Sequence, residues 1–316
     1  MKRMRAVGPE AVGLWAGHGG FTPGSAVTVQ MMNRFSNLYG CQNWHPAMIC
    51  WGLGGFGVGL TGALKVNTKE DMAENSRMIV LWGSNIASQP NTARHIISAR
   101  RRGAKVVTID VRRTEAAAQS DEVLLIRPGS DAALALAVMQ VIITERLYDP
   151  AFVEAHTAGF EELSTHVLPF TPAWGAEETG LEASQINSFA REYGSTRPTM
   201  ILIGGSSMHK GANGWHAARA ISCLPALTGD FGLPGGGLGP RYGAASASFR
   251  NLSAPERRPP GSYVPNQMPD ITEALSSGRL KVLLLLGTNM LSSFADAGHV
   301  ADGLDKAKLV VCIDCS

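Results

Sequence analysis

Long apolar segments, strong net charge and disulfide-type cysteine spacing are all missing from this chain. Charged residues make up only 17% of its 316 residues and the formal net charge is +2. This small charge does not favour binding to nucleic acid or to an anionic membrane. No apolar run approaches the length of a membrane span, and residues 282–286 are only as long as a strand. We therefore expect a protein with no membrane span and no nucleic-acid partner.

Cysteine is scarce as well. The five cysteines are odd in number and scattered, which argues against a secreted disulfide framework: Cys41, Cys50, Cys223, Cys312 and Cys315. Residues 312–315 form a CxxC, but in a predicted strand without a second pair, so a zinc or redox site is not favoured. Residues 1–5 are basic with no apolar signal-peptide core behind them, which predicts a cytoplasmic protein. An export signal on a preceding segment would instead direct it to the periplasm.

Short apolar runs alternate with helical patterns through most of the chain. The runs predict strands at residues 11–16, 78–82, 104–109, 122–126, 199–203, 280–286 and 309–313. Helical patterns occupy residues 25–38, 91–102, 132–145 and 215–227, with a helical insert at 149–197. Alternation of this kind predicts an α/β fold with mostly parallel sheets.

A Ser-, Pro- and Arg-rich stretch at residues 244–269 is the least structured part and is expected to cross between two lobes. We predict two Rossmann-like lobes. One is discontinuous and comprises residues 1–45 and 245–316. The other is continuous, comprises residues 46–244 and carries Cys50.

Small and acidic residues follow the predicted strands. They are Gly83-Ser84-Asn85, Asp110, Gly129-Ser130-Asp131, Gly204-Gly205-Ser206, Gly287-Thr288-Asn289 and Asp314. Ligands of open α/β sheets bind beyond the carboxyl ends of the strands, where backbone N–H groups meet phosphate and carboxylates accept from ribose or guanine. Two such sets, one in each lobe, predict two nucleotide-like ends. Asp131 has a simpler alternative role as a helix N-cap.

A thiol, a histidine and a glycine run lie together at residues 43–57. Cys50 stands between Trp44 and Trp51, with His45 nearby, and residues 52–57 match GxGxxG with Asp71 about 20 residues on. The dinucleotide fingerprint requires a preceding strand, and residues 42–49 do not have a strand pattern, so an NAD-dependent dehydrogenase is the minor hypothesis. A thiolate in this setting is a ligand for a soft metal or a nucleophile.

Taken together, an ordered set of motifs resembles the molybdopterin oxidoreductase family, also called the dimethyl sulfoxide reductase family. The set is LWGSN at 81–85, QP at 89–90, RRGAKVVTIDVRRTE at 101–115, IRPGSDAAL at 126–134, LTGD at 227–230, PGGG at 234–237 and GTN at 287–289. The resemblance covers nearly the whole chain. It implies molybdenum or tungsten held by two molybdopterin guanine dinucleotides, and two-electron or oxygen-atom transfer on a small substrate that the sequence does not identify.

The resemblance also implies roles for individual residues. Cys50 is the implied metal ligand, with Cys41 as its rival and a buried inert cysteine as the alternative. Arg241 and His45 are the other catalytic candidates, against a solvated arginine and a structural histidine. The implied cofactor-binding residues are Gly83, Ser84, Asn85, Ser88, Asp110, Arg112, Gly129, Asp131, Gly205, Ser206, Met208, His209, Gly287, Asn289 and Asp314. A solvated helix-start loop is the alternative for the segment containing His209.

Several positions depart from the family pattern. Trp51 stands where formate dehydrogenases have a histidine after the metal ligand, and the GQNN run that usually follows the arginine in this family is replaced by GAAS at residues 243–246. The closely spaced cysteines of a [4Fe–4S] cluster, expected in the parent enzyme, have no match here. We expect a piece of a longer enzyme with an electron-transfer partner subunit. The competing hypothesis is a non-catalytic scaffold, of which the large iron–sulfur subunit of respiratory NADH dehydrogenase is an example.

Overall fold

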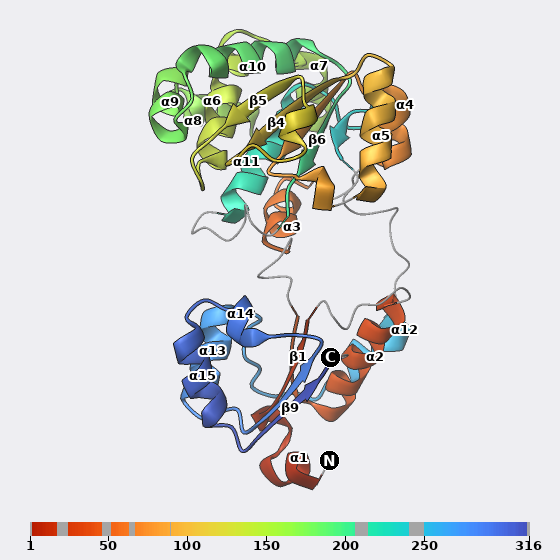
Figure 1. Ribbon diagram of the computed structural model, residues 1–316, viewed down its shortest axis with the longest axis vertical. Coiled ribbons are helices and arrows are strands. Elements are labelled where there is room, and N and C mark those ends of the chain that lie inside the picture. The colour runs from red at the N-terminus through yellow and green to blue at the C-terminus, as the bar shows by residue number, and fades with distance from the viewer. Residues whose placement is uncertain are drawn as a thin grey trace. The chain divides into compact units, whose positions relative to one another are not determined.

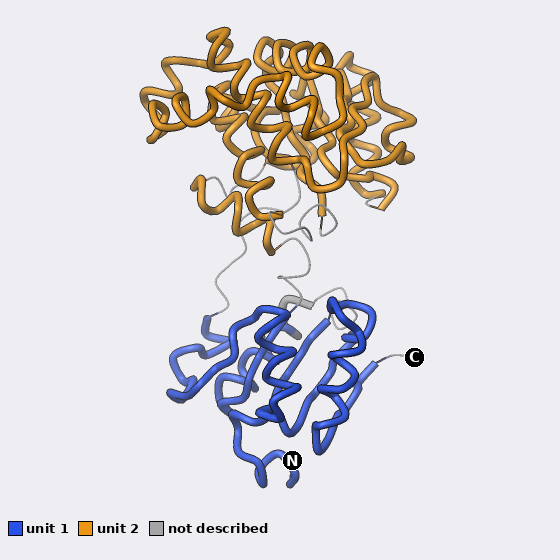
Figure 2. The backbone as a smooth tube through the Cα atoms, turned by 90° about the vertical axis from the view of Figure 1, so that its left-hand side faces the viewer, with its two compact units in different colours: residues 1–49, 247–316 blue, residues 50–246 orange. Residues whose placement is uncertain are grey.

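The computed structural model describes residues 2–17, 25–45, 52–62, 67–88, 90–205, 214–239 and 250–314. The chain forms two compact units, which we describe separately. Unit 1 comprises residues 1–49 and 247–316, and unit 2 comprises residues 50–246 (Figure 2).

Unit 2 is built on a parallel five-stranded sheet of order β5-β4-β3-β6-β7 (Figure 1). Its strands are β3 (Met78–Trp82), β4 (Lys105–Asp110), β5 (Glu122–Leu125), β6 (Thr199–Ile203) and β7 (Gly237–Leu238). Its helices are α3 (Gly52–Gly59), α4 (Lys69–Asn75), α5 (Pro90–Arg101), α6 (Asp131–Thr144), α7 (Pro150–His156), α8 (Phe160–Val167), α9 (Pro172–Thr179), α10 (Ala183–Ser195) and α11 (Gly214–Leu227).

Helices cover both faces of this sheet, and alternate residues of each strand point to opposite faces, so both sets of side chains are buried. Met78, Val80 and Trp82 pack into the core shared with α6, α10 and α11. Ile79 and Leu81 pack into the second core, shared with α4 and α5. All five residues of β3 are buried, which explains its continuous apolar sequence.

Unit 1 contains a parallel four-stranded sheet of order β2-β1-β8-β9. Its strands are β1 (Val12–Ala16), β2 (Gln42–Trp44), β8 (Val282–Leu286) and β9 (Leu309–Ile313). One face packs with α1 (Lys2–Val7) and α2 (Ser25–Tyr39), and the other with α13 (Met268–Ser276), α14 (Met290–Ser293) and α15 (Ala297–Asp305). The short α12 (Arg250–Ser253) lies against α2, where Arg34 donates to the Leu252 carbonyl (3.1 Å). The prediction of an α/β fold with parallel sheets is confirmed.

Two strands were missed by the sequence pattern, β2 and the two-residue β7. Residues 42–44 form β2, although the sequence predicted no strand there. Gln42 is fully buried, and its amide group donates to the Glu10 and Ser262 carbonyls (3.0 and 2.9 Å) and accepts from the Val264 N–H (2.8 Å). These contacts with distant segments, and not a local apolar pattern, hold the strand in the sheet.

The glycine run at residues 52–57 forms most of helix α3. A Cβ on Gly57 would lie 2.1 Å from the Trp215 carbonyl oxygen, so glycine at this position lets α3 pack directly on the backbone of α11. The apolar residues of α2 differ in burial. Met31 is 50% exposed, whereas Met32 and Phe35 pack against the core.

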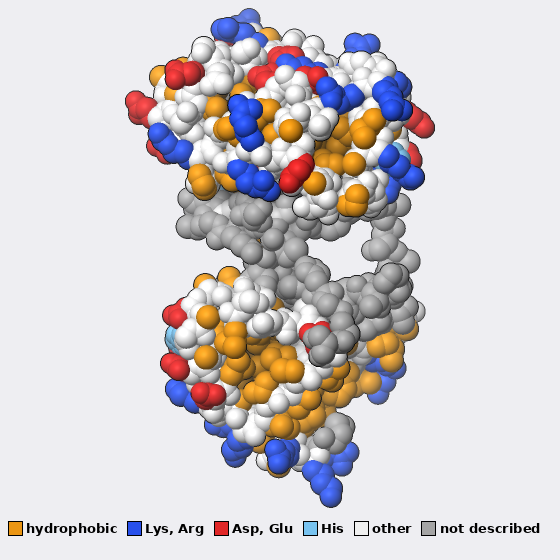
Figure 3. All heavy atoms as spheres, in the orientation of Figure 1, with side chains coloured by type: hydrophobic (Ala, Val, Ile, Leu, Met, Phe, Trp, Pro, Cys, Tyr) orange, Lys and Arg blue, Asp and Glu red, His pale blue; other side chains and the backbone are white. Residues whose placement is uncertain are grey.

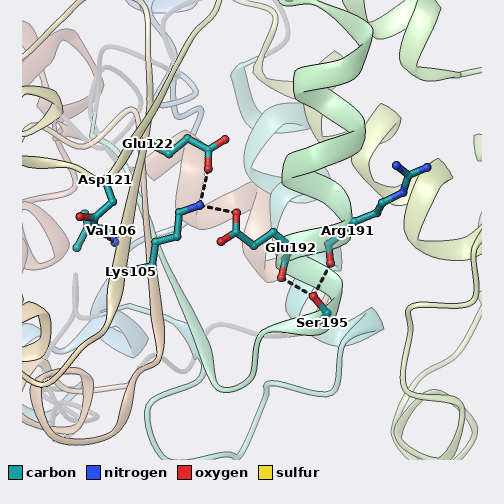
Figure 4. Close-up of polar contacts among 7 residues, drawn as sticks. All are labelled: Lys105, Val106, Asp121, Glu122, Arg191, Glu192 and Ser195. Atoms are coloured by element: carbon teal, nitrogen blue, oxygen red, sulfur yellow. Dashed lines mark hydrogen bonds and ion pairs between the residues drawn. The ribbon is translucent and has the colours of Figure 1, made fainter.

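An ion-pair cluster closes the amino end of the unit 2 sheet. Lys105 Nζ lies 2.6 Å from Glu122 Oε2 and 2.5 Å from Glu192 Oε2, joining β4 to β5 and to α10 (Figure 4). Burial lowers the pKa of Lys105, but its contacts with the two glutamates outweigh this and raise it overall. This cluster therefore fixes the sheet at the end opposite the strand-end loops. Among the helices that the structure describes, none is long and apolar enough to cross a membrane.

Candidate functional site

The strand order of unit 2 changes direction between β3 and β6. From β3 the chain continues to β4 and β5 on one side, while β6 and β7 extend the sheet on the other. The loops that leave β3 and β6 therefore run in opposite directions. In open α/β sheets, ligands bind in the crevice between two such loops, at the carboxyl ends of the strands.

Two glycines hold this switch point together. Gly83 follows β3 and donates to the Ile109 carbonyl (2.7 Å), and Gly204 follows β6 and donates to the Trp82 carbonyl (2.7 Å). A Cβ on Gly204 would lie 1.8 Å from the Gly83 oxygen, a distance that no side chain could accept. Gly83 itself has a φ of 59°, in the region that favours glycine.

The side chains next to Gly83 organise the loop. Asn85 donates to Glu115 (2.8 Å) and accepts from the Ala87 N–H (3.3 Å), so its amide group is used within the protein. The pKa of the exposed Glu115 is lowered, first by a hydrogen bond from the backbone N–H of Glu115 itself and then by the hydrogen bond from Asn85. Ser84 is buried beside them. These contacts fix the path of the backbone away from β3.

Two carboxylates lie at the ends of neighbouring strands: Asp110 is the last residue of β4, and Asp131 follows β5. Asp131 is 5% exposed and accepts from Trp82 Nε1 (2.9 Å). Burial raises its pKa to about 6 against the effect of the Trp82 hydrogen bond, and the charge of Asp110 raises it further. The N-cap of α6 is Ser130, so the N-cap role considered for Asp131 is wrong. Its contact with guanosine stays a prediction.

Unit 1 has the same kind of switch point, between β1 and β8. Gly17 donates to the Leu286 carbonyl (2.8 Å), and Gly287 donates to the Ile313 carbonyl (2.8 Å). A Cβ on Gly17 would lie 2.4 Å from the Gly287 oxygen, and Gly287 has a φ of 52°. Asn289 is the N-cap of α14, and its carbonyl accepts from the Ser293 N–H (3.1 Å).

The strand registers make the two switch points equivalent residue by residue. Met78 pairs with Lys105 and Thr199 in unit 2, as Val282 pairs with Leu309 and Val12 in unit 1. Following each strand to its end makes these pairs correspond: Gly83 with Gly287, Asn85 with Asn289, Asp110 with Asp314, and Gly204 with Gly17. The loose sequence echo between GSN and GTN is therefore a structural correspondence.

The remaining predicted residues fall into two groups. Four are exposed around these loops: Ser88, Arg112, Gly129 and Asp314; Gly205 is half-buried. Five lie outside the described residues: Cys50, Arg241, Ser206, Met208 and His209. Gly17, Trp82 and Glu115 were not predicted as site residues, and Gly204 was named only as part of the loop that follows its strand. A position directly after a strand was the available signal for the two glycines, whereas the tryptophan and the glutamate are found only through their contacts.

Two candidates from the first segment lie in unit 1. His45 is exposed, its backbone is held by Asn266 on both its N–H and carbonyl (3.3 and 3.2 Å), and partial desolvation lowers the pKa of its imidazole. Cys41 is fully buried, and burial raises the pKa of its thiol to about 11. Cys41 lies in the core beside Met4, Val12 and Leu14, and the choice of Cys50 over Cys41 as metal ligand stays a prediction.

The dinucleotide-fingerprint alternative does not fit the fold. The strand before the glycine run, β2, belongs to unit 1, whereas α3 belongs to unit 2, so they do not form one βα unit. Asp71 has both carboxylate oxygens engaged, accepting from the Gly235 N–H (2.6 Å) and from Asn75 Nδ2 (3.0 Å). It therefore anchors the glycine loop before β7 rather than offering a free carboxylate to a ribose.

The family model for the molybdopterin oxidoreductases matches residues 1–316. The chain belongs to the molybdopterin oxidoreductase family. It is 32% identical over 273 residues to "Probable oxidoreductase YoaE" of Bacillus subtilis, a match that covers 84% of this chain and 39% of that protein. It is 35% identical over 260 residues to dimethyl sulfoxide reductase DmsA of Escherichia coli, covering 72% of this chain and 30% of that protein.

The fold is shared with a solved structure. The structure of acetylene hydratase from Pelobacter acetylenicus superposes with a TM-score of 0.78 and 24% sequence identity, and the match covers 99% of this chain and 48% of the hydratase chain. The chain thus spans less than half the length of each of these three proteins.

Proposed function

We propose that this chain forms the two nucleotide-holding lobes of a molybdenum- or tungsten-dependent oxidoreductase, with one molybdopterin guanine dinucleotide at the switch point of each unit. The observation that carries the proposal is the equivalence of the two switch points. In each unit a glycine that follows one strand packs on the backbone of a glycine that follows the neighbouring strand. Each unit also has an aspartate at the carboxyl end of the next strand, Asp110 or Asp314. A cofactor with two identical ends needs two such places.

The residues present fit a nucleotide. Gly83, Gly205 and Gly287 are half-buried at strand ends and carry no side chain that would obstruct phosphate, although the N–H groups of Gly83 and Gly287 are already used within the sheets. The carboxylates of Asp110 and Asp314 stand one strand further on, where they would accept from hydroxyl or N–H groups. In unit 2 the buried Asp131 lies beside Asp110 and is the candidate for the guanine edge. The other predicted residues, Ser84, Asn85, Ser88, Arg112, Gly129, Ser206, Met208, His209 and Asn289, complete the set.

Cys50 is the proposed metal ligand, and His45 and Arg241 are the proposed polar groups near the substrate. When bound, the metal and its pterin dithiolenes supply two-electron or oxygen-atom transfer, and the protein supplies position and charge. The whole protein is proposed to act on a small substrate, to pass electrons to a partner subunit and to work in the cytoplasm. Its [4Fe–4S] cluster would require cysteines other than those of this chain.

Metal and pterin analysis tests the proposal. The chain is produced in a host with a working molybdenum cofactor pathway, and molybdenum, tungsten and oxidised-pterin fluorescence are measured per chain. We expect stoichiometric metal in the natural chain, at least a tenfold loss in Cys50→Ala, and no loss in the matched control Cys41→Ala. Metal retained in Cys50→Ala would remove Cys50 as the anchor. A folded natural chain with neither metal nor pterin would favour the scaffold.

A further inference from the structure

A large cleft lies in the helical layer of unit 2, and residues of α6, α7, α8 and α11 line it. Its volume is about 1830 Å³, well above the roughly 300–1,000 Å³ of a compact ligand site, so it has room for an elongated ligand. None of its described lining residues belongs to the loops that follow β3 and β6. The cleft is therefore separate from the switch point of unit 2.

The floor and one end of the cleft are apolar. Leu136 of α6 lies in the floor, and Phe152 and Phe231 line the cleft where α11 ends. This end is identified by the Asp149 N–H, which donates to the Leu227 carbonyl (2.8 Å) at the end of α11 and at the start of α7. By contrast, the face of unit 2 drawn in Figure 3 carries Lys, Arg, Asp and Glu side chains interspersed with small apolar patches. The cleft thus offers a continuous apolar surface to a ligand.

Helix α11 gives the cleft a direction. His216, Arg219, Cys223 and Leu227 all line it, and their spacings of three and four residues place them on one face of the helix. This face is basic or polar in the first half of α11 and apolar in its last turns. The N-terminus of an α-helix also carries a partial positive charge. An anionic group is therefore favoured along the first half of α11, and an apolar chain along the second.

The guanidinium of Arg219 is available to such an anion. Arg219 is exposed, and within the part of the chain that the structure describes no carboxylate pairs with it. Burial raises the pKa of the Cys223 thiol, and the charge of Arg219 partly opposes this, so the guanidinium lies near that thiol in the cleft. Glu162 of α8 is the one carboxylate among the described lining residues, and it is exposed. A guanidinium beside an apolar floor suits a carboxylate with an apolar body.

We propose that this cleft binds a single-chain acyl carboxylate, with its carboxylate at Arg219 and His216 and its chain lying along Leu136, Cys223 and Leu227. Arg219 would donate two parallel N–H hydrogen bonds to the carboxylate, and each methylene group that leaves water would add to the affinity. Because the chain lies inside the cleft, the ligand is the free acid and not a bilayer surface. The inference depends on the fold of unit 2 and not on the proposed cofactor.

Cys223 is a reporter within the cleft, and the exposed Cys312 of unit 1 is an internal reference. The chain is treated with a thiol reagent at rising concentrations of dodecanoate, and the labelling of each cysteine is followed by mass spectrometry. Dodecylamine, which has the same chain and the opposite charge, is the ligand control. Arg219→Gln removes the charge from the cleft, and Arg101→Gln, at the exposed end of α5, is the matched control.

We expect saturating dodecanoate to slow the labelling of Cys223 by about tenfold or more, with no change at Cys312 and no protection by dodecylamine. The half-protecting concentration should rise about tenfold in Arg219→Gln and stay unchanged in Arg101→Gln. Calorimetric titration with dodecanoate gives a second measurement that does not depend on the thiol. Ala226→Phe fills the apolar half of the cleft and should abolish the heat of binding.

Several outcomes would overturn the proposal. The first is dodecanoate that gives neither heat nor protection of Cys223. Others are equal protection by dodecylamine and an unchanged half-protecting concentration in Arg219→Gln. Protection by anionic lipid vesicles but not by monomeric dodecanoate would assign the cleft to a bilayer. Labelling that slows as a dimer forms in ultracentrifugation, without added ligand, would assign the cleft to a second copy of the chain.

Discussion

Unit 1 and unit 2 place the same glycine contact at the same point of a parallel sheet but reach it in opposite chain order. In unit 2 the pair β3–β4 comes first and β6–β7 follows, whereas in unit 1 β1–β2 comes first and β8–β9 follows. The close approach is thus a property of strand register and not of chain order. The units differ in what surrounds it, because unit 2 adds β5, a buried aspartate and an ion-pair cluster.

The largest expected effect is steric, at the two buried glycines. Gly204→Ala should lower the free energy of unfolding of unit 2 by about 3 kcal/mol and Gly17→Ala that of unit 1 by about 2 kcal/mol, since each Cβ meets backbone that cannot move aside. Segment-resolved hydrogen exchange in urea measures the two units separately. Gly103→Ala is the control: φ is 95° but nothing lies within 4 Å, so it should cost about 1 kcal/mol. If Gly17→Ala lowers the free energy of unfolding no more than Gly103→Ala does, the switch points of the two units are not equivalent.

The second effect distinguishes the units by pH. Burial raises the pKa of Asp131 to about 6 from an ordinary value of 3.8, so between these values the folded state binds more protons than the unfolded state. The free energy of unfolding of unit 2 therefore falls as pH rises through this range, by on the order of 2–3 kcal/mol for this group. Asp131→Asn keeps an oxygen for Trp82 but does not titrate. The stability of the variant relative to the natural chain should rise by that amount between pH 4 and pH 7.5, and parallel pH profiles would contradict the assignment.

The smallest effect concerns the amino ends of the sheets, where Lys105 of unit 2 corresponds to Leu309 of unit 1. Lys105→Leu should lower the free energy of unfolding by about 1 kcal/mol in chemical denaturation, because the half-buried lysine forms ion pairs with two glutamates. Salt at 0.5 M (an assay condition of roughly a 4 Å Debye length) should make this loss smaller, since it screens the ion pairs. Arg191→Ala breaks the more exposed pair with Glu145 and should cost less than about 0.5 kcal/mol. A larger loss in Arg191→Ala would show that the cluster does not fasten the sheet.

The sequence predicted most of this architecture because most elements carry their own signal. Residues 199–203 and 309–313 were predicted as strands with the bounds that the structure shows, and the strand-end loops were recognised as small and acidic. Local pattern failed where distant contacts decide the structure. The buried Gln42 makes β2 a strand, and the packing of Gly57 on α11 makes the glycine run a helix.

The candidate site was only partly accessible from sequence. The echo between residues 83–85 and 287–289 was visible, but its extension to Gly17 and Gly204 was not, because the two halves of the sheets occur in reversed chain order. The engagement of Asn85 with Glu115, and of Asp131 with Trp82, depends on side chains that are 30 and 49 residues apart. No local pattern encodes such pairs.

Guanosine diphosphate, the chemistry of each cofactor end, gives the most direct test of the central claim that both switch points bind a nucleotide. The nucleotide is titrated into isotopically labelled chain while backbone amide NMR signals are recorded, with adenosine diphosphate as the control. The account predicts saturable shifts, larger for the guanine nucleotide, at residues 83–85 and 204–205 in unit 2 and at residues 17 and 287–289 in unit 1. Shifts confined to one unit, or equal shifts with both nucleotides spread over the surface, would contradict it.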